Sequence, residues 1–176
     1  MKTNIALIGF MGAGKSTVGK ILAERLKKKY VEVDSRIAGE AGKSILQIFN
    51  EEGEIGFRER EIKAIKKIAG GKNQVIDCGG GVVLNRINID RLKQDAVIVW
   101  LTASPADIYK RIADQSKGRP VLKGNVRKSE IRSLMRFRQP FFERAADIEV
   151  DTSGLALESV ADRITDELRK NADFNL

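Results

Sequence analysis

The chain contains no histidine and a single cysteine, Cys78, among its 176 residues. The absence of histidine excludes imidazole acid–base catalysis and zinc sites built on histidine ligands. One cysteine cannot form a disulfide within the chain, and we interpret Cys78 as a buried thiol in a reducing compartment. No apolar run approaches the length of a membrane span, and no signal peptide precedes the first predicted strand. We therefore expect a cytoplasmic protein with no membrane partner.

Basic residues outnumber acidic ones by 32 to 24, which gives a formal net charge of +8. Most of the excess lies between Ser116 and Arg144, where nine basic residues accompany two acids. A local concentration of positive charge suits a compact polyanion, such as a nucleoside triphosphate, better than a long duplex. A solvated basic helix face is the alternative explanation for several of these residues.

Apolar runs and amphipathic stretches alternate along the chain. The patterns predict buried strands at 4–8, 30–33, 74–78, 96–101 and 147–150, and helices at 15–28, 43–49, 53–68 and 127–144. Another helix is expected to open at Ser104, because Pro105 and Asp107 follow it at the positions typical of a capped N-terminus. The length predicts a single domain, 1–176. Five strands separated by helices indicate an α/β fold of three layers, with a five-stranded parallel sheet covered on both faces.

The stretch GFMGAGKST follows the first predicted strand and opens the first predicted helix. Four residues separate Gly9 from Gly14, and Lys15-Ser16 follow directly, which is the phosphate-loop pattern G-x-x-x-x-G-K-S in its expected context. Such a loop turns its backbone N–H groups inward at a helix N-terminus and forms a nest for anions. We therefore predict that the loop binds a nucleoside triphosphate, with Lys15 on the β- and γ-phosphates and Ser16 on Mg²⁺.

A phosphate-binding loop does not decide whether water or a second substrate receives the phosphoryl group. The small size argues against a motor or a switch GTPase, and the chain has no Asn-Lys-x-Asp sequence that would read guanine. Ligands of parallel sheets bind at the carboxyl ends of the strands. The deciding residues should therefore be Asp34, the Gly79–Gly81 run and the arginines that follow.

Several stretches resemble the shikimate kinase family, in order and at family-like intervals over essentially the whole chain: GFMGAGKSTVGKILAERL, VEVDSRI, GKSILQIFNEEGEIGFRERE, CGGGVV, GRPVL and RQPFFERAADIEVDTS. The most specific pieces are Gly53-Glu54 leading to Phe57-Arg58 and Glu61, the triple glycine, and Arg119-Pro120. The resemblance implies a nucleoside-monophosphate-kinase-like fold with a substrate-binding helical region at about 34–62 and a mobile lid at about 116–125. It also implies transfer of the ATP γ-phosphate to the 3-hydroxyl of shikimate, with Mg²⁺, in aromatic amino-acid biosynthesis.

The resemblance also implies roles for individual residues. Two arginines would hold the shikimate carboxylate in bidentate contacts, and the glycine turn would approach the ring through its backbone N–H groups. An aspartate would orient the ring hydroxyl or accept its proton. The residues expected to bind the acceptor are Asp34, Arg58, Gly79, Gly80, Gly81 and Arg138. Those expected to bind the nucleotide are Gly12, Ala13, Gly14, Lys15, Ser16, Thr17, Arg111 and Arg119, and those expected to be catalytic are Lys15, Asp34 and Arg119.

Two acids depart from the family pattern. Glu32 stands where the family usually has an aspartate tied to the water shell of the metal, and Asp77 stands where the family often has a small residue. An acid at the end of an apolar strand is typical of a Walker B position, so we assign Ser16, Glu32 and Asp77 to the metal. The segment from Arg111 to Arg119 is about one residue longer than usual. Arg111 is expected either to stack on adenine or to lie on the surface.

Several alternatives remain open at this point. The acceptor could be gluconate or another polyol acid, although paired arginines favour a carboxylate. The chain could also be a nucleic-acid-binding protein that combines a phosphate-binding loop with the basic segment. A third alternative is a regulatory homologue without catalytic activity. Arg58 could simply pair with Glu61 on a helix surface, and Asp34 could cap a helix near Ser35. We expect Trp100 in the core, a small-molecule partner alone, no nucleic acid, and a monomer.

Overall fold

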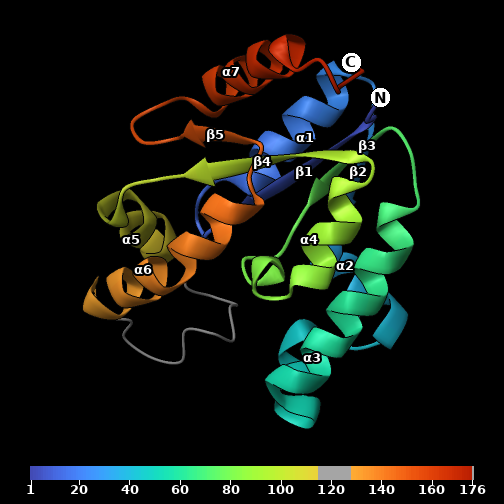
Figure 1. Ribbon diagram of the computed structural model, residues 1–176. Helices are drawn as coiled ribbons and strands as arrows, with labels where there is room; N and C mark the ends of the chain where they lie inside the picture. The colour runs from blue at the N-terminus through green and yellow to red at the C-terminus, as the bar shows by residue number, and fades with distance from the viewer. Residues whose placement is uncertain (115–127, 176) are drawn as a thin grey trace.

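The structure is a computed structural model that describes residues 1–114 and 128–175. In this part of the chain, seven α-helices alternate with five strands that form one parallel sheet in the order β2-β3-β1-β4-β5 (Figure 1). The strands are β1 (Asn4–Gly9), β2 (Lys29–Glu32), β3 (Gln74–Asp77), β4 (Ala96–Thr102) and β5 (Ile148–Asp151). The predicted five-stranded parallel sheet is therefore confirmed.

Helices cover both faces of the sheet, which confirms the predicted three layers. Side chains alternate along the buried central strand: Ile5 and Leu7 enter one core cluster, and Ala6 and Ile8 enter the other. In Figure 1, α1 and α7 lie above the sheet, whereas α2, α3, α4 and α6 lie below it. The helices are α1 (Lys15–Arg25), α2 (Val33–Ala41), α3 (Ile45–Ala69), α4 (Arg86–Lys93), α5 (Pro105–Asp114), α6 (Lys128–Ala145) and α7 (Leu157–Lys170).

Local sequence signals explain where two of the helices begin. The N–H of Asp107 donates to the Ser104 hydroxyl oxygen over 3.1 Å, so the predicted cap of α5 is confirmed. Ser44 and Gln47 form a reciprocal capping box at the start of α3. The break predicted before 53 is also present, because Gly53 has a φ of 69° and kinks α3. Two helical segments thus meet at Gly53 within the span of α3, as the sequence predicts.

The end of the second strand was predicted wrongly. β2 ends at Glu32, and α2 begins at Val33, so that Asp34 lies in the first turn of a helix instead of at the end of a strand. Val33 and Ile37 are four residues apart and both are buried, which is the spacing of a helix face. α4 and a short 3₁₀ helix at Val82–Leu84 were not predicted from the sequence. None of the helices in the described ranges combines the length and hydrophobicity that a membrane span requires.

Candidate active site

The glycine-rich loop joins the carboxyl end of β1 to the N-terminus of α1. Gly14, directly before the helix, has a φ of 96°, a conformation that other residues rarely adopt. It has no side chain that could cap the first N–H groups of α1, which are therefore left for an anion. The nearly buried Lys15 folds over the loop and donates to the carbonyl oxygens of Gly9 over 3.0 Å and of Phe10 over 3.1 Å. The loop thus presents both a helix N-terminus and a cation.

Three of the residues predicted to bind the acceptor converge on the glycine turn after β3. A Cβ atom on Gly79 would lie 3.0 Å from Oδ1 of Asp34. A Cβ atom on Gly80 would lie 3.5 Å from Nη1 of Arg138, which donates to the Gly80 carbonyl over 3.3 Å. A Cβ atom on Gly81 would overlap the guanidinium of Arg58. The distance at Gly80 is an ordinary van der Waals contact, so it is at Gly79 and Gly81 that the lack of a side chain leaves room for Asp34 and Arg58.

The converging residues line one pocket of about 310 Å³, and Lys15 and Ser16 of the glycine-rich loop line it too. Phe49 and Phe57, whose stacked ring centroids are 4.5 Å apart, form an apolar part of its wall. The candidate acceptor site and the candidate phosphate site are therefore continuous.

Four acids also line this acceptor pocket, but the part of it around two arginines favours an anion. Arg138 is only 7% exposed, and burial, followed by the charge of Arg58, lowers the pKa of its guanidinium. Two guanidinium groups that repel each other in a pocket gain from a shared negative ligand. A small molecule with a carboxylate group meets this requirement.

Glu61 is fully buried beside the pocket and connects it to α4. Arg58 Nη1 donates to Glu61 Oε1 over 2.9 Å, and Asn88 Nδ2 donates to Glu61 Oε2 over 3.4 Å. Burial raises the pKa of Glu61 to about 6, although the neighbouring Arg58 acts in the opposite direction. The pairing considered as a surface contact in the sequence analysis is thus real but buried, and it holds Arg58 at the glycine turn. The family-like motif contained Glu61, but no sequence signal pointed to Asn88.

The residues assigned to magnesium meet at the ends of β2 and β3. Glu32 and Asp77 are neighbours in the register of the two strands, and both line the acceptor pocket with Ser16. The Ser35 hydroxyl donates to Glu32 over 2.6 Å, and the Tyr30 hydroxyl donates to Asp77 over 3.0 Å. Within the described ranges, no cluster of three or more acidic, cysteine or histidine side chains could hold a metal alone. Hard oxygen donors that need phosphate and water to complete the shell fit Mg²⁺.

Arg111 is held against the glycine-rich loop. Its guanidinium donates to the carbonyl of Gly12 over 3.1 Å and to the hydroxyl and carbonyl oxygens of Thr152, each over 3.1 Å. The adenine contact expected of Arg111 stays a prediction. Arg119 and the lid expected at about 116–125 lie outside the described residues.

Comparisons with known proteins agree with one another. A family model described as shikimate kinase matches residues 11–169. A shikimate kinase from Symbiobacterium thermophilum is 38% identical over 171 residues, which cover 97% of this chain and 98% of the relative. Another from Thermodesulfovibrio yellowstonii is 44% identical over 167 residues and covers 95% of both chains. The solved structure of the shikimate kinase from Acinetobacter baumannii in complex with shikimate has a TM-score of 0.92 at 32% identity, and covers 98% of this chain and 96% of that one.

Proposed function

Because this chain belongs to the shikimate kinase family, we propose an account of how its residues carry out the reaction of that family. The enzyme transfers the γ-phosphate of ATP to the 3-hydroxyl of shikimate, which is a step of aromatic amino-acid biosynthesis. In this transfer the acceptor oxygen forms a bond to phosphorus, the bond from phosphorus to the β,γ-bridging oxygen breaks, and the hydroxyl loses its proton. The roles of the individual residues are the proposal.

Arg58 and Arg138 bind the carboxylate of shikimate, while the backbone of Gly79, Gly80 and Gly81 contacts the ring. The observation that carries this assignment is the convergence of Asp34, Arg58 and Arg138 on the glycine turn, in one pocket with Lys15. Charge-assisted bidentate contacts fix both the position and the direction of a carboxylate. The acceptor hydroxyl is thereby held at the end of the pocket that meets the phosphate-binding loop.

Asp34 orients the acceptor hydroxyl and takes up its proton. The loop residues Gly12 to Thr17 bind the phosphates, and Lys15 neutralises the charge that develops on the transferred group. Arg111 contributes to nucleotide binding, and Arg119 acts from the lid at about 116–125. A substrate-binding helical region at about 34–62 completes the single domain, 1–176.

Magnesium belongs to this reaction, since ATP is bound as its Mg²⁺ complex in the family. We assign Ser16 to the ion directly and Glu32 and Asp77 to its water shell. The ion, when bound, neutralises charge on the β- and γ-phosphates. The oxygen donors of these three side chains suit that ion.

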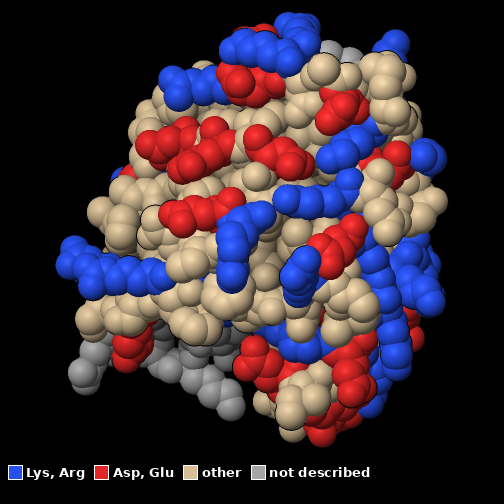
Figure 2. All heavy atoms as spheres, in the orientation of Figure 1, with Lys and Arg blue, Asp and Glu red and all other residues tan. Residues whose placement is uncertain are grey.

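We further propose a monomeric cytoplasmic enzyme whose partner is the small-molecule substrate, without nucleic acid or membrane. A buried free thiol at Cys78 supports a reducing compartment. Figure 2 shows basic and acidic side chains intermingled on one face of the molecule, whereas nucleic-acid-binding proteins gather basic groups in a patch or stripe. Arg138 of the basic segment is buried in the acceptor pocket.

The central experiment is release of ADP from ATP with and without shikimate, in a coupled assay. We expect turnover that depends on shikimate, and little turnover with gluconate or other hydroxy acids. Equal turnover with gluconate would contradict the assigned acceptor. The salt dependence of any DNA retention on a filter tests the nucleic-acid alternative, because phosphate contacts give a steep dependence. Light scattering after gel filtration tests the monomer.

A further inference from the structure

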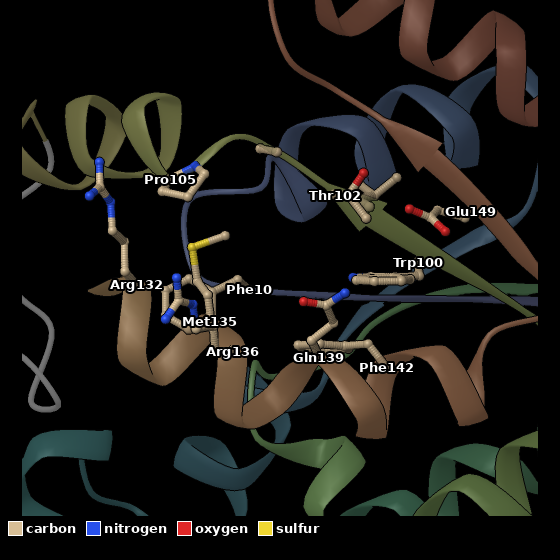
Figure 3. Close-up of a pocket in the computed structure, with 12 residues that line it drawn as sticks. Phe10, Trp100, Thr102, Pro105, Arg132, Met135, Arg136, Gln139, Phe142 and Glu149 are labelled. Carbon is tan, nitrogen blue, oxygen red and sulfur yellow. The ribbon is translucent and has the colours of Figure 1, made fainter. Parts of the chain in front are cut away.

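A second cavity, of about 600 Å³, lies between β4, β5 and α6 (Figure 3). Among the described residues, it shares no lining residue with the acceptor pocket, and none of the residues assigned to the nucleotide lines it. Phe10 lines this cavity, and the guanidinium carbon of Arg138 lies 5.8 Å from the centroid of its ring. Since Arg138 belongs to the acceptor pocket, Phe10 lies between the two sites. As far as residues 1–114 and 128–175 define the two sites, the cavity is therefore separate from the site of the reaction.

One wall of the cavity is aromatic. Trp100 on β4 and Phe142 on α6 stack with ring centroids 5.6 Å apart and an interplanar angle of 10°. Trp100 is buried in the core cluster, as expected from the sequence, and it also lines the cavity. Met135 adds a soft apolar surface on the α6 side (Figure 3). Such a surface favours a flat apolar ligand, which stacks against an aromatic wall with little loss of freedom.

The charged groups of the cavity are separated by sign, and Thr102 and Gln139 add neutral polar groups. Arg132 and Arg136 lie one helical turn apart on α6, and both are exposed. Neither guanidinium forms an ion pair with any residue that the structure describes. Figure 3 shows both arginines at one end of the cavity and Glu149 of β5 at the opposite end, beyond Trp100. The cavity thus offers cationic donors at one end and a carboxylate at the other.

We propose that this cavity is a second binding site, for a small organic anion with a flat ring body and one carboxylate group. The ring lies against the exposed part of Trp100 and against Met135, with the buried Phe142 behind Trp100, and the carboxylate accepts hydrogen bonds from Arg132 and Arg136. Glu149 disfavours a second anionic group at the far end. The volume lies within the range of about 300–1,000 Å³ found for small-molecule sites with mainly apolar walls and a few polar groups. The ligand chemistry inferred for this cavity does not depend on the proposed function, whereas its separation from the acceptor pocket does.

The test uses the single tryptophan of the chain. Its indole N–H gives one signal in an ¹⁵N-resolved NMR spectrum, and that signal reports directly on the cavity. Titration with 2-naphthoate should shift the signal and reach saturation. The uncharged analogue 2-naphthylmethanol should bind at least about tenfold more weakly, because it cannot accept charge-assisted hydrogen bonds from both arginines.

Matched variants separate the proposed contacts from general attraction between charges. The double variant R132Q/R136Q should bind 2-naphthoate at least about tenfold more weakly than the unchanged chain. The double variant R163Q/R169Q removes the same charge from α7, on the other side of the sheet, and should bind as the unchanged chain does. The proposal is overturned if the Trp100 signal does not saturate, if R132Q/R136Q binds normally, or if saturating shikimate abolishes binding of the probe.

Discussion

The hydroxyl of Tyr30 on β2 donates a 3.0 Å hydrogen bond to the carboxylate of Asp77 at the end of β3. Tyr30 lies opposite Val75 in the register of the strands, so Asp77 is its diagonal neighbour on the same face. Burial, followed by the charge of Asp77, raises the pKa of the Tyr30 hydroxyl far above its usual range. Tyr30 therefore keeps its proton and remains a donor. The same hydroxyl interacts with the side chain of Ser16, which connects Asp77 to the glycine-rich loop.

We predict that this pair tunes the magnesium dependence of the enzyme. Asp77→Asn should raise the Mg²⁺ concentration for half-maximal activity by about fivefold, which corresponds to about 1 kcal/mol, the scale of one hydrogen bond to a water of the metal shell. Tyr30→Phe should act in the same direction, because it leaves the nearly buried Asp77 carboxylate without this donor. Glu32→Ala tests the other assigned carboxylate in the same assay.

Asp90→Asn is the matched control, since Asp90 is an exposed acid on α4 and its loss changes the charge equally. Isothermal titration of Mg²⁺ with a bound non-hydrolysable ATP analogue gives a readout that does not depend on turnover. If Asp77→Asn, Tyr30→Phe and Glu32→Ala all bind Mg²⁺ normally and Tyr30→Phe unfolds at a lower urea concentration, the hydrogen bond between Tyr30 and Asp77 has only a structural role.

The sheet and the phosphate-binding loop could be predicted because their signals are local. β1 and β4 are runs of apolar residues, and the glycine pattern fixes the loop between β1 and α1. α4 was missed because its sequence RINIDRLK is short and mostly polar. The start of α2 was missed because Val33 continues the apolar alternation of β2, although its side chain packs with that of Ile37 on a helix face.

Local sequence could not show which residues form the site, because contacts between distant segments bring them together. Arg58, Arg138 and the glycine turn are far apart in the sequence. The rule that ligands bind at the carboxyl ends of parallel strands indicated the glycine turn and the arginines after it, and the family resemblance singled out Arg58 and Arg138. Nothing local indicates that Asn88 reaches Glu61 across 27 positions of the chain. Trp100 likewise looks like any core residue of an apolar strand, and the cavity beside it depends on where α6 lies.

The second prediction concerns Lys15. Lys15→Met should reduce the rate of phosphoryl transfer to less than about a tenth, because transfer depends on a positioned positive charge at the phosphates. Methionine is a flexible side chain that fills the nearly buried position without a charge. Circular dichroism should show an intact fold. If the variant keeps more than about a tenth of the rate, the barrier has changed by less than about 1.4 kcal/mol. That result would show that Lys15 does not stabilise the phosphates during transfer.

The third prediction separates the acceptor from the nucleotide. Arg58→Ala and Arg138→Ala should each raise KM for shikimate with little change in KM for ATP. Each removes charge-assisted hydrogen bonds to a carboxylate, worth about 1.5–3 kcal/mol, or a factor of about 10 to 100. Arg144→Ala is the control on α6, the helix of Arg138, since Arg144 is exposed and lies outside the acceptor pocket. A rise in KM for ATP alone would rule out the carboxylate clamp.

The fourth prediction is a pH dependence that originates in Glu61. With a pKa of about 6, Glu61 becomes a neutral acid as the pH falls through 6, and its ion pair with Arg58 is lost. KM for shikimate should therefore rise below about pH 6, while KM for ATP stays nearly constant. Glu61→Gln lacks the ion pair at every pH, so its KM for shikimate should be raised and should not change across this range.

The free energy of unfolding should increase as the pH falls, whereas the affinity for shikimate should decrease. The folded chain takes up a proton at Glu61 near pH 6, whereas the unfolded chain does so only near the ordinary pKa of about 4.5. The contribution of Glu61 to the free energy of unfolding therefore increases as the pH falls from about 6 to about 4.5, by about 2 kcal/mol. Urea unfolding of the unchanged chain and of Glu61→Gln over this range measures the difference. Parallel curves for the two proteins would show that Glu61 does not titrate there.

The final prediction concerns Asp34, the residue proposed to accept the proton of the acceptor hydroxyl. Its carboxylate lies at Gly79 in the acceptor pocket, within the first turn of α2. An alcohol must lose its proton as its oxygen bonds to phosphorus, and the chain has no histidine to receive it. A carboxylate that lines the same pocket as Lys15 and Ser16 can both orient the hydroxyl and accept the proton.

Asp34→Asn keeps the size and hydrogen-bonding capacity of the side chain but removes its basicity. We expect kcat to fall by about 10²-fold or more, the usual scale for a positioned general base, with KM for ATP nearly unchanged. The competing role is a structural one, because an acid in the first turn stabilises a helix by about 0.3–1 kcal/mol through its dipole. Asn would lose that contribution too, so melting temperature and kcat must be measured together. A lower melting temperature with near-normal kcat would make Asp34 a helix-stabilising residue and would require another group to receive the proton.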